Sequence, residues 1–444
     1  MGKRTLTEPK AEPRLQSTPR GGVPSLTDTP AGYHRACEAL AASAGPLAAD
    51  AERASGFRYG HEDWLIQFKR EGAGIILLDP VALTRAGVDW NEFNEAVGDA
   101  VWIIHDAMMD LPGFADIGLR PRRLFDTEIA ARLLGLRRFG LASVTEHYLG
   151  ITLAKEHSAA DWSYRPLPYD WRNYAALDVE LLIELETLMR GELKLAGKAE
   201  WAEQEFAHVL AEGTSGRPRH AHPVPWLRIS HITEIARDPR GLAIARALWT
   251  KRDELARLHD ISPTLLLEDS SIIEAAKRKP RNAREFRAVR CLNERVRMHT
   301  GSEQDKMFER YAPIQRAVKP SVWKAVIQEA LALPAADLPV VPSGRGDARG
   351  GADDSEETNA PRGMRMWERR PERLERLKRA RRVVNQIAED TRTPADVIVR
   401  PQIIRNLCWT DDPASRDVAA FLRAQGARDW QVALIAASVS RAIL

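Results

Sequence analysis

Residues 46–80, PLAADAERASGFRYGHEDWLIQFKREGAGIILLDP, contain three short strand-like runs in close succession. The first run ends in an acidic pair, Asp50 and Glu52. The second and third, 64–68 and 75–78, are separated by a turn that contains glycine, which is typical of a β-hairpin. Side chains at positions i and i+2 of a strand point to the same face. The stretch therefore predicts a sheet that presents both acidic side chains on one face.

The sequence that follows supplies more acidic residues on predicted strands and helices. A fourth strand-like run, 101–105, precedes Asp110. A long amphipathic helix over about 170–195 carries Tyr174 and Asp178, which are four residues apart and so share one side of the helix. A hairpin followed by alternating strands and helices predicts an α/β domain with a mixed sheet.

These side chains would form a site for hard cations if they converge. Clustered carboxylates repel one another unless cations or protons compensate them, and an all-oxygen donor set suits Mg²⁺. Each element alone has a simpler interpretation: Asp50 and Glu52 as a solvated or ion-paired couple, and Asp110 as an acid at a helix N-terminus. With a normal pKa near 10, Tyr174 would position a water molecule better than deprotonate it.

Charge is divided unevenly along the chain, whose net charge is +3. Residues 1–215 carry 23 Lys/Arg and 32 Asp/Glu, whereas residues 216–444 carry 42 and 30. A basic half beside an acidic one favours binding of a polyanion. An ordinary solvated surface would explain the same charge division. There is no apolar run of membrane-spanning length, no signal-peptide core at the N-terminus, and three scattered cysteines form no disulfide framework. We therefore expect a cytoplasmic protein without a membrane contact.

From about residue 225 the pattern becomes helical throughout, and it repeats. Residues 238–242 correspond to 370–374 at an offset of 132, and residues 271–273 correspond to 402–404 at an offset of 131. Such self-similarity predicts two related helical bundles. We expect a disordered tail over 1–32, the α/β domain over 33–215, a helical domain over 225–310, a helical connection over 311–339, a flexible linker over 340–363 and a second, divergent helical domain over 364–444.

Four segments together resemble the ribonuclease D family, which belongs to the DEDD superfamily of 3′–5′ exonucleases. They are residues 46–80, HDAMMDLPGF (105–114), LRPRRLFDTEIAARLLG (119–135) and KEHSAADWSYRPLPYDWRNYAALDVELL (155–182), and the likeness covers about residues 34–200. It implies a ribonuclease-H-like fold. Residues 225–300 similarly resemble the HRDC domain, and the second helical domain resembles a divergent copy of it.

The resemblance implies that Asp50, Glu52, Asp110 and Asp178 bind two divalent ions, Mg²⁺ or Mn²⁺. Tyr174 would place the chain in the tyrosine subclass. The implied activity is hydrolysis of RNA 3′ ends to nucleoside 5′-monophosphates, with structured RNA such as tRNA precursors as the partner. Two alternatives stay open: a DNA 3′–5′ exonuclease that acts in repair, and a non-catalytic RNA-binding scaffold.

Two features of the sequence depart from this pattern or extend it. Arg53 follows Glu52 where the family often has an aromatic residue, so base contacts at this point differ. In the loop before the long helix, Lys155, His157 and Arg165 are candidates for phosphate contacts. Trp162 in the same loop could stack on a base, but we favour a packing role. For Arg165 two interpretations stay open, a phosphate contact and an ion pair with Asp161.

Overall fold

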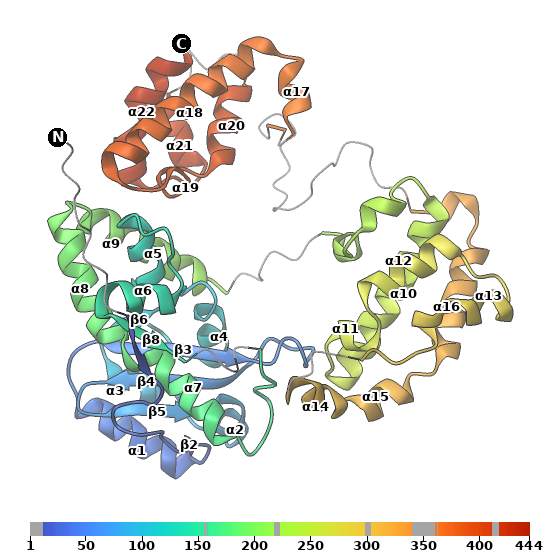
Figure 1. Ribbon diagram of the computed structural model, residues 1–444, viewed down its shortest axis with the longest axis horizontal. Helices are drawn as coiled ribbons and strands as arrows, with labels where there is room; N and C mark the ends of the chain where they lie inside the picture. The colour runs from blue at the N-terminus through green and yellow to red at the C-terminus, as the bar shows by residue number, and fades with distance from the viewer. Residues whose placement is uncertain are drawn as a thin grey trace.

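The computed structural model describes residues 12–154, 157, 159–216, 223–297, 303–339, 360–361, 363–410 and 417–444. Its α/β domain is followed by two helical domains, which lie at different sides of it (Figure 1). This confirms the predicted fold class, an α/β domain with a mixed sheet followed by helical bundles. The expected flexible linker falls almost entirely outside the described residues.

Six strands form the central sheet in the order β2-β5-β4-β3-β6-β7. β4 pairs antiparallel with both β3 and β5, as the hairpin prediction requires, whereas β6 and β7 extend the sheet in parallel with β3. The sequence interpretation did not include β7. The strands are β2 (Leu26–Thr27), β3 (Leu47–Arg53), β4 (Asp63–Arg70), β5 (Gly74–Leu78), β6 (Val101–Ile104) and β7 (Arg123–Asp126).

Helices cover both faces of this sheet. Phe68 of β4 packs in the main core with Phe93 and Trp102, on the side of α1 and α3, whereas Leu65 packs with Trp171 on the opposite side, against α7. This alternation follows from the two-residue period of a strand. The helices of the domain are α1 (Pro30–Ala41), α2 (Pro80–Arg85), α3 (Trp90–Val97), α4 (Leu111–Ile117), α5 (Thr127–Leu133), α6 (Leu141–Leu149), α7 (Tyr169–Glu180), α8 (Leu182–Leu195) and α9 (Ala199–Gly213).

The prediction of a disordered tail over 1–32 is wrong for residues 12–32. β1 (Arg14–Gln16) pairs with β8 (Ile151–Leu153) in a separate two-stranded sheet, and β2 pairs with β5. The segment between them lies on α7, where Asn173 Nδ2 donates to the Ser17 carbonyl at 2.7 Å. Open strand edges supply these backbone partners, which a reading of local composition does not detect. Residues 1–11 lie outside the described part of the chain.

The predicted long helix over 170–195 is two helices, α7 and α8, which meet at Leu181. Lys69 of β4 donates its ammonium group to the carbonyl of Glu180 and forms an ion pair with the carboxylate of the same residue at 3.6 Å. A carbonyl engaged in this way is satisfied without an intrahelical partner. The break therefore has a tertiary cause, and no proline or glycine marks it in the sequence.

The two helical domains share a pattern of helix lengths. α10 (Pro239–His259) and α18 (Pro371–Thr391) each contain 21 residues, and each is followed by a four-residue helix, α11 (Pro263–Leu266) and α19 (Ala395–Ile398). This agrees with the repeat predicted from the sequence. The other helices are α12 (Asp269–Arg278), α13 (Ala283–Ala288), α14 (Glu303–Glu309), α15 (Ala312–Ala317) and α16 (Pro320–Ala332) in the first domain, and α17 (Met364–Glu368), α20 (Pro401–Trp409), α21 (Val418–Ala424) and α22 (Asp429–Ile443) in the second.

The segment 311–339 is not a mere connection between the helical domains. Trp323 and Ile327 of α16 are buried in the core of the first helical domain with Leu248 of α10. Arg240 Nη1 also donates to three carbonyls at the end of α16, at 2.6–3.2 Å. The first helical domain therefore extends to the end of α16.

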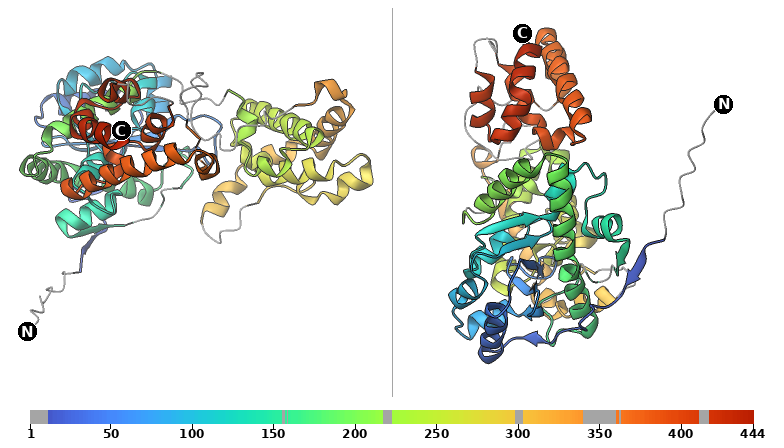
Figure 2. Two further views of the ribbon diagram at one scale, coloured as in Figure 1. Left: turned by 90° about the horizontal axis from the view of Figure 1, so that it is seen from above. Right: turned by 90° about the vertical axis from the view of Figure 1, so that its left-hand side faces the viewer.

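The second helical domain lies against α9 of the α/β domain, and two views show them side by side (Figures 1 and 2). The indole rings of Trp201 and Trp430 stack with centroids 4.7 Å apart. Glu205 accepts hydrogen bonds from Arg428 at 2.7 and 2.8 Å and from the Trp430 indole at 2.7 Å.

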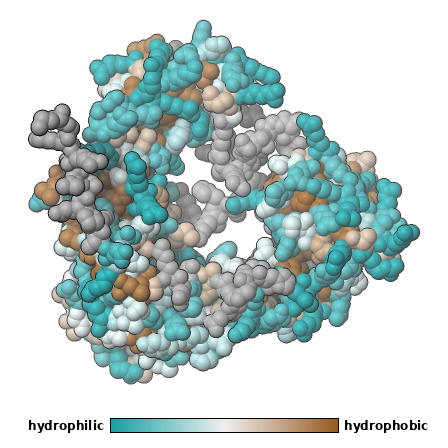
Figure 3. Space-filling model, viewed as in Figure 1, coloured by the Kyte–Doolittle hydropathy of each residue, from teal (hydrophilic) through white to brown (hydrophobic). Residues whose placement is uncertain are grey.

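The space-filling view shows three lobes around a central hollow (Figure 3). Among the described residues, no helix is long and apolar enough to span a membrane.

Candidate metal centre and active site

Three of the five predicted site residues meet where β3 passes under α7. Asp50, Glu52 and Asp178 each offer a carboxylate oxygen, and these oxygens lie within 4.8 Å of one another. Asp50 and Glu52 share a face because they are two residues apart on β3, opposite Gln67 and Leu65 of β4 in the antiparallel register. Gln67 donates a hydrogen bond from its amide to Asp50, which fixes one carboxylate oxygen.

The fourth carboxylate, Asp110, lies beside this group and is held by Arg53. Asp110 precedes α4 at the N-cap position, but its side chain makes no capping hydrogen bond. Arg53 Nη2 instead contacts Asp110 Oδ1 at 2.6 Å, Arg53 Nε contacts Asp63 Oδ1 at 2.8 Å, and the guanidinium also donates to the Met109 carbonyl. Arg53 thus acts as an internal cation for two carboxylates that are each only 4% exposed.

Burial and mutual repulsion make these carboxylates poor at holding a negative charge. Burial raises the pKa of Asp50 and Glu52 well above their ordinary range, and the neighbouring carboxylates raise both pKa values further. Burial likewise raises the pKa of Asp178 and of Asp110 to about 7, although hydrogen bonds from Tyr174 and Arg53, respectively, oppose the rise. A bound cation would relieve this repulsion directly.

The donor set fits a hard divalent cation. All three clustered side chains offer carboxylate oxygens, the ligands that Mg²⁺ and Mn²⁺ prefer. The clustered negative charges repel one another, and a divalent cation would offset that repulsion. The predicted divalent-metal centre is therefore confirmed by this geometry, and Asp110 lies close enough to raise the pKa of Asp50.

Tyr174 lies one helical turn before Asp178 on α7, and the two side chains share a hydrogen bond. Burial, followed by the charge of Asp178, raises the Tyr174 pKa above its ordinary value. The phenol therefore stays protonated at neutral pH and can donate a hydrogen bond. Its ring packs against Trp162, with centroids 6.1 Å apart.

The candidate phosphate contacts have different outcomes. Arg165 donates to Asp79 Oδ2 and to the carbonyls of Trp64, Trp162 and Tyr164, each at 2.7 Å, so its guanidinium holds the loop together and is not free for phosphate. The Asp161–Arg165 bridge, the alternative for Arg165, does not form, because Asp161 pairs with Arg310 of the first helical domain and Arg165 pairs with Asp79.

Of the other residues in that loop, Trp162 has the packing role that we favoured, whereas His157 and Lys155 stay candidates for substrate contact. Trp162 is fully buried, which supports its packing role. The His157 ring lies 6.4 Å from the Tyr174 ring, so it stays a candidate for substrate contact. Lys155 lies outside the described residues.

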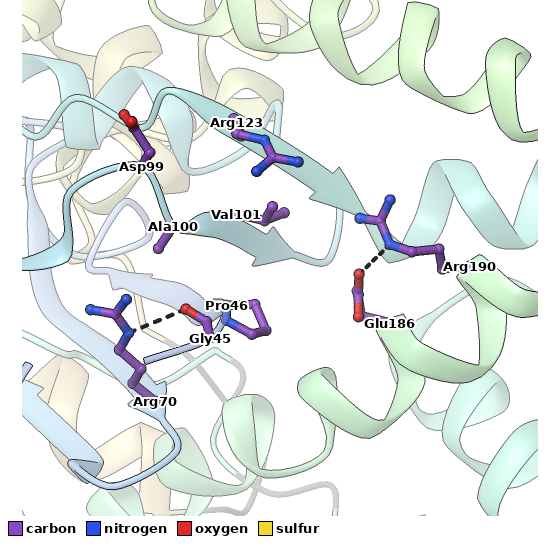
Figure 4. A pocket seen from close by; sticks show the side chains of 9 residues that line it. All are labelled: Gly45, Pro46, Arg70, Asp99, Ala100, Val101, Arg123, Glu186 and Arg190. Carbon is purple, nitrogen blue, oxygen red and sulfur yellow. Dashed lines mark hydrogen bonds and ion pairs between the residues drawn. The ribbon is translucent and has the colours of Figure 1, made fainter. Parts of the chain in front are cut away.

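A pocket of about 470 Å³ lies beside the start of β3 (Figure 4). It is lined at the starts of β3, β6 and β7, whereas Asp50 and Glu52 lie towards the end of β3. Arg70 donates to the carbonyls of Leu40 and Gly45, and Arg190 pairs with Glu186. Two of the three arginines that line the pocket are therefore held by protein partners, and none of Asp50, Glu52, Asp110 and Asp178 lines it.

Sequence reasoning missed the residues that support the carboxylates. Gln67 had a signal, because it is a polar residue in an apolar strand and shares its face with Leu65. Asp63 carried no local signal, because its partner Arg53 lies on the neighbouring strand.

Three parts of the chain match known protein families. Residues 25–194 match the family described as 3′–5′ exonuclease, residues 241–303 match the HRDC domain, and residues 360–443 match a family described as the 3′ to 5′ exonuclease C-terminal domain. A crystal structure of a protein from Bifidobacterium adolescentis is 66% identical, has a TM-score of 0.90, and aligns with 97% of this chain and all of its own.

Proteins named ribonuclease D are among the relatives. The one from Shewanella sp. (strain ANA-3) is 28% identical over 52% of this chain and 59% of its own length, and that from Pseudomonas paraeruginosa is 28% identical over 57% and 65%. The alignments thus span less than two thirds of either relative. The crystal structure of Escherichia coli RNase D is 21% identical, with a TM-score of 0.57, over 94% of this chain and 98% of that one, and it supports the fold.

The mixed sheet and the carboxylates on β3, on α7 and directly before α4 define a ribonuclease-H-like domain of the 3′–5′ exonuclease class. The HRDC match places a helical domain of known type directly after it. Residues 25–194 thus carry a 3′–5′ exonuclease domain, and the chain is similar to proteins named ribonuclease D.

Proposed function

We propose that this chain is a 3′–5′ exoribonuclease that removes nucleotides from RNA by hydrolysis. The observation that carries the proposal is the convergence of Asp50, Glu52 and Asp178 within 4.8 Å, with Asp110 beside them. Four carboxylates from three elements form the donor set that two-metal phosphodiester hydrolysis needs. Two divalent ions, Mg²⁺ or Mn²⁺, would supply an activated water and stabilise the leaving oxygen.

The residues of the chain would divide the remaining tasks. The protonated Tyr174 hydroxyl would orient the attacking water by hydrogen bonding. Water would attack the terminal phosphorus, and the bond from phosphorus to the 3′ oxygen of the preceding nucleotide would break. The products would be a nucleoside 5′-monophosphate and an RNA shortened by one residue with a free 3′ hydroxyl.

The helical half supports the choice of RNA as partner. It carries the positive balance of the chain, and its first domain matches the HRDC family. Structured RNA such as tRNA precursors is the proposed substrate class, and counterion release predicts that salt weakens binding steeply. We also propose a cytoplasmic location, which the three free cysteines support.

The test uses 5′-labelled RNA and a DNA of the same sequence, each with Mg²⁺ or with EDTA. We expect a ladder of RNA products that shorten from the 3′ end, only with Mg²⁺. Asp178→Asn should abolish the ladder, whereas the control Asp170→Asn should not, because Asp170 is exposed on the same helix. Efficient shortening of DNA alone would favour the repair alternative. No shortening of either substrate would support the non-catalytic scaffold and refute the proposal.

A further inference from the structure

Two loops flank the acidic cluster, and both are held by the first helical domain. The Phe57 loop, residues 54–62, continues directly from Arg53 at the end of β3. The Trp162 loop, residues 159–168, leads into α7, which carries Tyr174 and Asp178. Figure 1 shows α14 and α15 of the helical domain next to this side of the α/β domain. Phe308 of α14 and the turn residues Arg310 and Tyr311 before α15 make the contacts with these loops.

The Phe57 loop inserts an aromatic side chain into the helical domain. Phe57 is 2% exposed, and its ring stacks on Phe308 with centroids 4.5 Å apart. It also packs against Tyr311, and its carbonyl accepts a hydrogen bond from the Ser262 amide at 2.8 Å. A buried stacked aromatic with a backbone hydrogen bond fixes both the position and the direction of the loop.

The Trp162 loop places a negatively charged side chain, Asp161, against the first helical domain. The Asp161 side chain is fully buried, and Oδ2 accepts from Arg310 Nη1 and from the Tyr311 hydroxyl, each at 3.0 Å. Oδ1 accepts from Ser163 at 2.5 Å. A buried carboxylate is stable only with such partners, and Arg310 and Tyr311 both come from the helical domain. The next residue, Trp162, packs on the Tyr174 ring.

Arg58 joins the two loops to each other and to the same domain. Its Nε donates to Ser163 Oγ at 2.9 Å, and its Nη1 contacts Asp260 Oδ2 at 3.0 Å. A continuous set of contacts therefore runs from the helical domain to Tyr174 on one side of the acidic cluster, and to the strand of Asp50 and Glu52 on the other.

We propose that residues 307–311 of the first helical domain are positioning residues for the active site. They hold the Phe57 loop and the Trp162 loop so that β3 and α7 keep the spacing at which Asp50, Glu52 and Asp178 share a cation. Small displacements of such groups have large effects on rate. The first helical domain would then affect hydrolysis of a substrate too short to be gripped by it. This inference rests on the proposed function.

The second domain interface supplies a matched control. Glu205 on α9 is also a buried carboxylate that accepts from an arginine and an aromatic side chain of a helical domain. No catalytic role is assigned to α9 itself. Substitutions on the helical side of each interface remove comparable contacts and leave the sequence of the α/β domain unchanged.

The test compares the double variant Arg310→Gln/Tyr311→Phe with Arg428→Gln in the full chain. kcat and KM are measured on a 5′-labelled RNA trinucleotide with saturating Mg²⁺, and binding of Mn²⁺ alone is measured by calorimetry without substrate. For the double variant we expect kcat to fall at least about tenfold, with KM within about twofold, and Mn²⁺ affinity to fall severalfold. Arg428→Gln should match the wild type in each measurement.

Circular dichroism and the single variant Tyr311→Phe keep the proposal testable if the double variant folds poorly. Tyr311→Phe retains the ring against Phe57 and loses only the hydroxyl, which bonds to Asp161 and Ser163, so a smaller fall in kcat is expected. Wild-type kcat and Mn²⁺ affinity in both variants would overturn the proposal. So would a defect limited to KM on long RNA, because that is the result of gripping alone. A wild-type chain that binds Mn²⁺ but does not cleave would refute the proposed function, and the Mn²⁺ comparison would still decide this inference.

Discussion

Arg53→Gln should destabilise the metal-free protein strongly. The Arg53 guanidinium contacts Asp110 at 2.6 Å and Asp63 at 2.8 Å. Its side chain is 14% exposed, and those of the two carboxylates are 5% and 1% exposed, respectively. Glutamine keeps a hydrogen-bond donor of similar size but removes the positive charge. Two buried carboxylates are then left without their counter-ion, which is the costly way to break a buried ion pair.

The expected loss follows from that burial. Removal of one partner of a buried ion pair costs about 3–5 kcal/mol. In a domain of this size each kcal/mol lowers Tm by roughly 2–4 °C, so the α/β domain should melt roughly 6–20 °C earlier. The loss should shrink at pH 5, because the pKa of Asp110 is about 7 even with Arg53 present, and a protonated carboxyl no longer needs a cation.

Calorimetry of the EDTA-treated protein at pH 7.5 and pH 5 measures both effects. The control is Arg122→Gln, which removes an ion pair with Asp99 whose side chains are 69% and 76% exposed. Such an exposed pair contributes about 0–1 kcal/mol, so Tm should barely move. If Arg53→Gln melts with the control at pH 7.5, or if its deficit is as large at pH 5, the reasoning about Arg53 as an internal cation is wrong.

Three further predictions concern metal, catalysis and domain docking. Burial raises the pKa of Asp178 and Asp110 to about 7, so the folded protein is stabilised by their protonated forms at low pH and loses that stabilisation as the pH rises through 7. Mg²⁺ should therefore raise Tm more at pH 8 than at pH 5.5, and equal Tm shifts in calorimetry would contradict this. Tyr174→Phe should lower kcat about 10²-fold with KM unchanged in steady-state assays, whereas a rise in KM alone would assign Tyr174 to binding. Glu205→Ala removes the buried carboxylate that pairs with Arg428, which keeps the Gly426 carbonyl of its own domain as an acceptor. Docking of the second helical domain should weaken, which small-angle scattering would register as a larger radius of gyration, and an unchanged radius would contradict this prediction.

How much the sequence predicts depends on how local the cause is. Asp50 and Glu52 share a face because of the two-residue period of a strand, and Tyr174 and Asp178 share a side because of the helical period, so both pairs follow from the sequence. The break at Leu181 depends on Lys69, which reaches α7 from a strand far away in the chain. No local pattern carries that contact.

The same limit applies to the supporting contacts of the site. Asp161 and Arg165 lie four residues apart, which suggests a local ion pair, yet Asp161 pairs with Arg310, 149 residues away. The order of residues 12–32 similarly arises from pairing with β8 and β5. Sequence patterns predicted the residues of the candidate site, and the fold determines how they are held.

The carboxylate cluster is proposed to direct water to the phosphorus at the 3′ end of RNA. Mass spectrometry of the products released in ¹⁸O-labelled water tests this proposal directly. We expect nucleoside 5′-monophosphates that carry one ¹⁸O in the phosphate, released from the 3′ end first, with Mg²⁺ and not with EDTA or in Asp178→Asn. Label on a 3′-phosphate, cyclic phosphates, internal fragments, or release that persists in Asp178→Asn would contradict it.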